Sequence, residues 1–152
     1  MPFTPAHTAI VLPFLRINPE RVSATALVIG SVAPDFEYFL KMSVNGQHSH
    51  TFLGIFYFDI PVTIGLAFLF HEVVKKNLIS NLPAFFQYRF QLLLQLDFKE
   101  HFKRYYWVVI ISAGIGSFSH IFWDAFTHND GFFAQRITLY KHMVVSFDGV
   151  RY

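Results

Sequence analysis

Two long apolar stretches constrain this chain more than any other feature. Residues 52–70 contain a single charged side chain, Asp59, and residues 105–126 contain only Asp124. Each stretch is close to the roughly 20 residues that a helix needs to cross the core of a bilayer. Only 14% of the chain is charged, against about 25% in an ordinary soluble domain. We therefore predict an all-α integral-membrane bundle with two spanning segments.

Shorter helices are expected around these two segments. Residues 22–33 are apolar but end at Pro34, which predicts a partial, re-entrant or buried helix. Residues 83–96 have the pattern of an amphipathic helix that lies on a membrane surface. Asp59 stands two residues before Pro61, so we expect a break or kink there, with Asp59 capping the second half. With 152 residues, the chain is expected to form one membrane-embedded domain, residues 1–152.

The charge distribution predicts the orientation. Half of the 12 basic residues lie between the two apolar segments, from Lys75 to Arg104, which places this loop in the cytoplasm of a multi-pass inner-membrane protein. The N-terminus has no basic region before its apolar residues, so we expect no cleaved signal peptide. The net charge of +2 is scattered, which gives no electrostatic case for a nucleic-acid partner.

A group of histidines and aspartates is the main candidate site. If the two segments are antiparallel spans, the start of the first, with His50, and the end of the second share one membrane face, the external one. His120 and Asp124 are four residues apart, about 6 Å along a helix, so both can reach one ion. His128 is about 12 Å from His120 and would serve a second ion, an outer position or a helix end.

Other candidates have an ordinary structural interpretation beside the metal one. Asp35 is either the N-cap of a helix at 36–42 or a ligand, and His7 is either a first-turn surface residue or a ligand. His50 is preferred over His48, which follows a turn sequence, because His50 adjoins the apolar segment. The chain has no cysteine, so any divalent metal must bind nitrogen and oxygen, as zinc, manganese or iron does.

Several motifs together resemble an uncharacterised bacterial integral-membrane family, over nearly the whole chain. They are the opening MPFTPAH, residues 29–36 (IGSVAPDF), residues 48–51 (HSHT), residues 58–61 (FDIP) and residues 119–128 (SHIFWDAFTH). Members of that family continue with further membrane helices beyond Tyr152, which implies a chain truncated at its C-terminus or a short form.

The order of the same residues is distantly similar to membrane-bound metal-dependent hydrolases and to zinc-dependent phospholipases C and nucleases. This resemblance implies that Asp35, His50, His120 and Asp124 hold zinc, with His7 in an adjacent site. It also implies that the zinc activates water against phosphodiesters.

Two functions follow as hypotheses. The first is a membrane-bound metal-dependent hydrolase that acts on a lipid or another phosphoester, with Asp124 or His128 handling protons. The second is a non-enzymatic membrane protein that uses the cluster for transport, proton relay or a structural metal site. Histidines that only pack inside a metal-free bundle would point apart.

Overall fold

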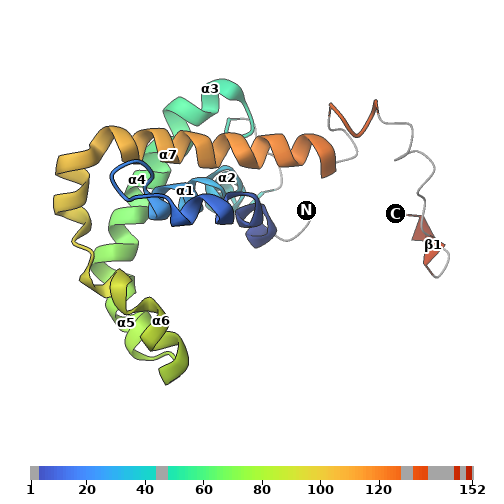
Figure 1. The fold of residues 1–152 in the computed structure, drawn as a ribbon. Coiled ribbons are helices and arrows are strands. Elements are labelled where there is room, and N and C mark those ends of the chain that lie inside the picture. Colours follow the sequence, from blue (N-terminus) through green and yellow to red (C-terminus); the bar gives the residue numbers. More distant parts are fainter. Residues whose placement is uncertain (1–3, 44–47, 128–131, 137–145, 148–149, 152) are drawn as a thin grey trace.

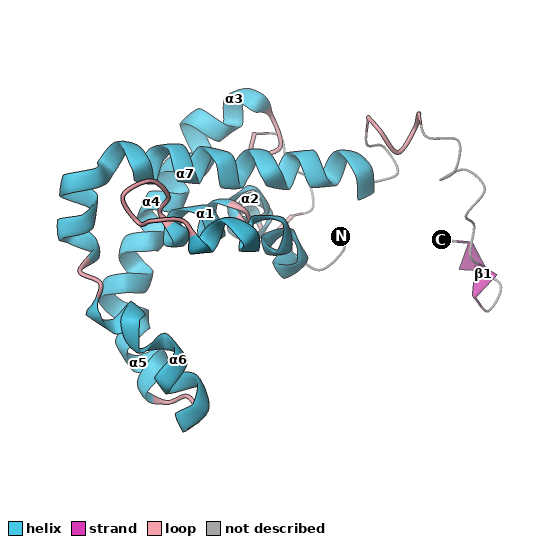
Figure 2. Cartoon of the chain, in the orientation of Figure 1, coloured by secondary structure: helices cyan, strands magenta, loops and turns pink. Residues whose placement is uncertain are grey.

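The computed structural model describes residues 4–43, 48–127, 132–136, 146–147 and 150–151. Its helical elements, in chain order, are η1 (Thr4–Arg16), α1 (Ala24–Gly30), η2 (Ala33–Asp35), α2 (Phe36–Lys41), α3 (Phe52–Gly54), η3 (Ile55–Asp59), α4 (Ile60–Leu69), η4 (Phe70–Val74), α5 (Lys75–Ser80), α6 (Ala84–Gln95) and α7 (Phe98–Thr127). Two strands of two residues, β1 (Ser146–Phe147) and β2 (Val150–Arg151), pair antiparallel. The predicted helical class is confirmed, since helices make up most of the described chain (Figure 2).

The first apolar segment lies in one helical run of 29 residues, Phe52–Ser80. The expected break at Asp59 is absent, because the helical run continues through this residue. A π-helical turn, η3, precedes α4, and Pro61 lies in the first turn of α4, where its missing N–H leaves few helical hydrogen bonds unmade. The cap prediction for Asp59 is wrong, because its side chain makes no capping hydrogen bond and is buried.

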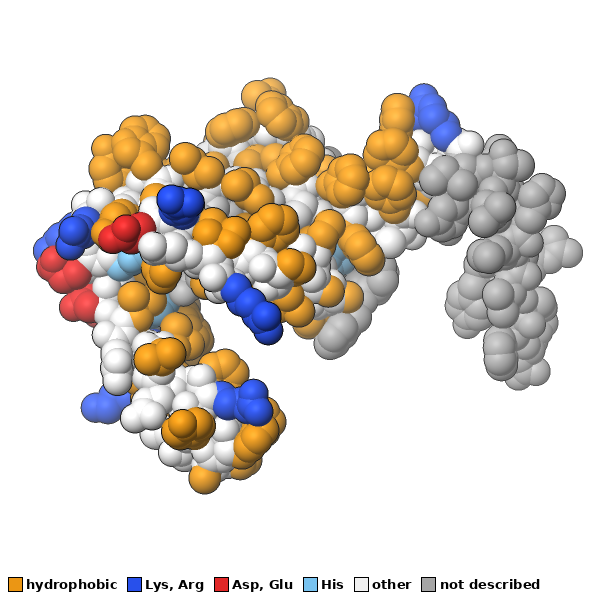
Figure 3. Space-filling model, viewed as in Figure 1, with side chains coloured by type: hydrophobic (Ala, Val, Ile, Leu, Met, Phe, Trp, Pro, Cys, Tyr) orange, Lys and Arg blue, Asp and Glu red, His pale blue; other side chains and the backbone are white. Residues whose placement is uncertain are grey.

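Two helical runs are long and apolar enough to cross a membrane, Phe52–Ser80 and α7. Only 28% and 33% of their most apolar windows are buried. A core helix of a water-soluble domain would bury most of that surface. Large apolar side chains such as Leu53, Phe56 and Trp107 are instead more than half exposed, and Figure 3 shows such side chains spread over this face of the molecule. A surface of this kind suits contact with lipid better than contact with water.

The two runs cross rather than lie parallel, with α7 passing in front of the run from α3 to α5 (Figure 1). The helix α1 packs along α7, and α4 contacts both. Ala26, Ala67, Phe98, Val109 and Ala113 form the buried apolar core where these helices meet. The sequence predicts a partial, re-entrant or buried helix at residues 22–33. The structure shows a short buried helix there.

Small residues allow α1 and α7 to approach at backbone distance. A β-carbon added at Gly30 would lie 2.6 Å from the carbonyl oxygen of Ala113, and one added at Gly116 would overlap the carbonyl oxygen of Leu27. The hydroxyl of Ser117 donates to the carbonyl of Gly30 at 3.2 Å. The small-residue run at 113–117 thus works as expected, as a surface for a neighbouring helix.

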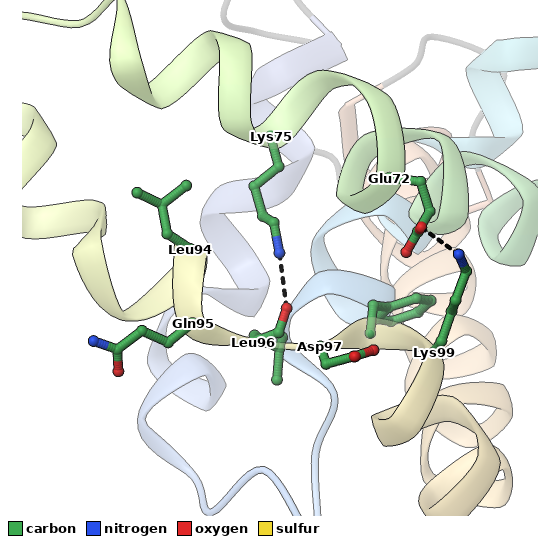
Figure 4. A pocket seen from close by; sticks show the side chains of 8 residues that line it. Glu72, Lys75, Leu94, Gln95, Leu96, Asp97 and Lys99 are labelled. Carbon is green, nitrogen blue, oxygen red and sulfur yellow. Dashed lines mark hydrogen bonds and ion pairs between the residues drawn. The ribbon is translucent and has the colours of Figure 1, made fainter.

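A hairpin of α5 and α6 projects from the body of the molecule (Figure 1). No residue of α6 is buried, and large apolar side chains of this helix, Phe85, Tyr88 and Leu92 among them, are exposed. Figure 4 shows the pocket where the hairpin meets α7: Lys75 donates to the carbonyl of Leu96 at 2.7 Å, and Lys99 pairs with Glu72 at 2.5 Å. These contacts fasten the hairpin to the N-terminal end of α7.

We predict that Gly116→Ala destabilises the protein by about 1–3 kcal/mol, because the added methyl group must push two backbones apart. Thermal unfolding in detergent measures the effect. Gly65→Ala is the matched control, since a β-carbon at Gly65 meets nothing within 4 Å. Equal melting temperatures for the two variants would contradict the close helix approach.

Candidate metal centre

Five side chains that are remote in sequence converge at one end of α7. His7 comes from η1, Asp35 from η2, His50 from the turn before α3, and His120 and Asp124 from α7. The structure thus brings together all five residues that the sequence proposed as metal ligands. His120 is fully buried, and the side chains of Asp35, Asp124 and His50 are 10%, 14% and 22% exposed, so the centre opens toward the surface on one side.

The four inner residues present their ligand atoms to one another at nearly equal distances. Nε2 of His50 lies 3.6 Å from Oδ1 of Asp35 and 3.5 Å from Oδ2 of Asp124. Nε2 of His120 lies 3.5 Å and 3.3 Å from the same two oxygens. Four contacts of similar length therefore join two nitrogens to two oxygens in a closed ring.

These distances fit a metal shell better than direct hydrogen bonds. N–H···O hydrogen bonds are about 2.7–3.2 Å long. Two atoms that bind one zinc ion at about 2.0–2.1 Å in a tetrahedron lie about 3.3–3.4 Å apart. The four nitrogen–oxygen distances are close to these edges, and His50, His120 and Asp124 form a group whose ligand atoms all lie within 4.8 Å of one another, whereas Asp35 belongs to a second such group with His7 and His120. Nε2 of His120 also has no hydrogen-bond partner among the described residues, although it is fully buried, and such an atom calls for a ligand.

The tautomer of His120 is determined by its other nitrogen. Nδ1 lies 2.8 Å from the carbonyl oxygen of Ser31, which can only accept a hydrogen bond. Nδ1 therefore carries a proton, and in the neutral ring Nε2 offers a lone pair to the centre. An outer carbonyl that orients a histidine in this way is typical of metal sites.

His50 is oriented by a relay that the sequence analysis missed. The hydroxyl of Ser49 donates to Oε2 of Glu37 at 2.7 Å, so its oxygen is free to accept from Nδ1 of His50, 3.0 Å away. Glu37 also accepts from the backbone N–H groups of His48 and Ser49. It is 1% exposed. The one signal in the sequence was a lone acidic residue within the apolar run 36–40 (FEYFL).

His7 occupies an adjacent position rather than the ring. Its Nε2 lies 2.8 Å from Oδ1 of Asp124, the oxygen that faces away from His50, and its ring stacks on that of His120. Its Nδ1 lies 3.0 Å from the carbonyl oxygen of Thr4. These two contacts hold the ring of His7 between Asp124 and the backbone of Thr4.

Three further expectations can be compared with the structure. Asp35 does not cap α2, because its side chain accepts from Thr4 and turns toward His50 and His120. His48 lies outside the cluster and contacts the hydroxyl of Tyr57 at 2.9 Å. His128, predicted to handle protons, lies outside the described residues.

Charge is balanced within the centre by protons. Burial alone would raise the pKa of Asp35, but the nearby imidazoles of His120 and His50 and the hydrogen bond from Thr4 outweigh it and hold this pKa well below its usual range. Burial alone would lower the pKa of His50, but the carboxylates of Asp124 and Asp35 raise it to about 9. A cation that enters the ring must therefore displace the proton of His50.

We predict that zinc binds more tightly as the pH rises from 6 to 8. His50 is protonated in the metal-free protein up to a pKa of about 9, so the proton competes with the metal at every pH below that value. The apparent affinity should rise by up to about tenfold per pH unit for each proton displaced. Titration with a competing chelator at several pH values measures it, and an affinity that does not change with pH would contradict the competition.

We predict that Glu37→Gln weakens zinc binding by about 10–100-fold, the usual effect of losing an outer partner of a ligand. The amide can donate to the Ser49 oxygen, so Ser49 no longer serves reliably as the acceptor for His50. Glu100→Gln, at an exposed surface pair with Lys103, is the control and should bind zinc as the wild type does. Equal affinities for both variants would show that the relay does not orient His50.

Comparison with known proteins adds a family but no activity. The family model of a domain of unknown function, DUF4184, matches residues 1–151. No curated protein and no solved structure matches the chain. Since the family model covers nearly the whole sequence, the chain belongs to the DUF4184 family.

Proposed function

We propose that this protein is a membrane-bound, metal-dependent hydrolase that acts on a phosphoester, with a lipid-linked molecule as the substrate. The observation that supports the proposal most is the ring of four ligand atoms at 3.3–3.6 Å from His50, His120, Asp35 and Asp124. Groups of three from these residues and His7 also lie within 4.8 Å of one another.

The donor set favours zinc as the metal. Two imidazole nitrogens and two carboxylate oxygens suit zinc, manganese or iron, and soft sulfur ligands are absent from a chain without cysteine. A bound metal lowers the pKa of water toward 7 and polarises an oxygen of a phosphoester.

The surrounding residues provide what a hydrolase needs beside its metal. His7 donates to the outer oxygen of Asp124 and is 3% exposed, so it is placed to supply a proton to a leaving group. The partly exposed side chain of His50 marks the side from which a substrate reaches the centre. His128, eight residues after His120 in the sequence, remains a further candidate for proton transfer.

The two apolar helical runs support a membrane location and, with it, a lipid-linked substrate. The proposed topology is multi-pass in the inner membrane, with the basic hairpin in the cytoplasm and the centre near the external face. Lys99 and Lys103 lie at the start of α7, whereas His120 and Asp124 lie near its end. α7 bends at Tyr105, and the two basic residues lie before this bend whereas the centre lies near the far end of the segment after it, so a centre on the opposite side from the basic loop is compatible with the fold.

A non-enzymatic function is the second candidate. Two histidines and two aspartates supply four possible ligands, and a closed shell of four protein ligands is typical of a structural zinc site. The full burial of His120 also favours a role in holding the helices together, in transport or in proton relay.

We predict about one zinc or manganese ion per chain in the detergent-purified protein, and none in the double variant His120→Ala, Asp124→Ala, which removes two of the four ring ligands. Elemental analysis measures the content, with His48→Ala as the control because His48 lies outside the ring. Metal-dependent cleavage of a phosphodiester by the wild type would favour the hydrolase, and bound metal without cleavage would favour the non-enzymatic function. Absence of metal from the wild type would rule out both metal functions.

A further inference from the structure

Asp59 is a buried carboxyl group that the metal centre does not use. Both Asp59 and Thr63, one helical turn further along, are 0% exposed. Neither oxygen of Asp59 has a hydrogen-bond partner among the described residues, and neither does the hydroxyl of Thr63. Buried carboxylates are normally paired or hydrogen-bonded, because an isolated buried charge is very costly.

The surroundings of Asp59 leave room for a proton but for nothing larger. Its oxygens have almost no surface that a water-sized sphere can touch, so a water molecule or a sodium ion would have to push the helices apart. A proton needs no such space and removes the charge. The neutral carboxylic acid is therefore the form that this packing favours.

The position of Asp59 links it to the centre. It is the last residue of the π-helical turn η3, a feature that often occurs at functional sites. It lies within electrostatic reach of His50, His120 and Glu37, which are the charged or titratable groups that act on it most from the neighbouring elements.

We propose that Asp59 is a proton-binding site, a neutral carboxylic acid that loses its proton when a divalent cation enters the metal centre. The O–H bond of the acid breaks, its electron pair stays on the carboxylate, and the proton leaves to the solvent. The divalent cation brings two positive charges and displaces the one proton of His50, so the centre gains one positive charge, which stabilises the carboxylate that remains. The packing around Asp59 is the evidence that this residue is protonated. The release of its proton rests on the proposed metal function.

Infrared spectroscopy of the detergent-purified protein tests the protonation. A protonated carboxyl group has a carbonyl stretch that a carboxylate lacks, and we expect this band at neutral pH in the wild type. Asp59→Asn should abolish it, and Asp97→Asn, at an exposed aspartate, should not. If Asp59→Asn does not fold, Thr63→Val serves instead, because loss of the nearby hydroxyl should shift the band. Absence of the band, or a band that neither variant changes, would overturn the proposal.

Zinc addition tests the release. The band should decrease, and in weakly buffered solution the wild type should release about one proton more per bound zinc ion than Asp59→Asn. Bound zinc with an unchanged band would overturn the release and leave a permanently neutral acid. Failure of the proposed metal function appears differently, since the protein would then bind no zinc while the band persisted.

Discussion

The close approach of α1 to α7 is the contact on which the rest of the structure depends. Gly30 and Gly116 lie at backbone distance from the opposite helix, where a side chain at either position would collide with a carbonyl group. One residue beyond Gly30, the carbonyl of Ser31 binds His120 at 2.8 Å. The same approach brings Asp35, at the end of η2, within 3.5 Å of His120. The packing of α1 against α7 therefore also determines the geometry of the metal centre.

The centre combines two partly buried carboxylates with three histidines that are each held from outside. The Nδ1 atoms of His7, His50 and His120 contact oxygens of Thr4, Ser49 and Ser31. Their Nε2 atoms turn inward to the aspartates. In the metal-free protein, the proton of His50 offsets part of the charge of the carboxylates, and a divalent cation would take over that role. This arrangement orients every ring before any cation arrives, which reduces the cost of binding.

The exterior and the interior of the molecule have opposite character. Large apolar side chains cover the long helices, whereas polar and titratable groups such as Asp59, Thr63 and His120 are fully buried. A water-soluble protein places these groups the other way round. In lipid the distribution is the expected one, since polar groups there are kept away from the hydrocarbon and usually have a function.

The sequence by itself determined the two long helices, because their length and apolar content leave few alternatives, and the pairing of His120 with Asp124, because residues four apart share a helix face. It also indicated the tight packing at 113–117 and favoured His50 over His48. Only the tertiary structure decided between capping and site roles for Asp35 and between surface and site roles for His7, because their partners lie up to 117 residues away. It also identified Glu37 and removed the expected cap at Asp59, since the position of a side chain relative to remote segments leaves no local pattern in the sequence.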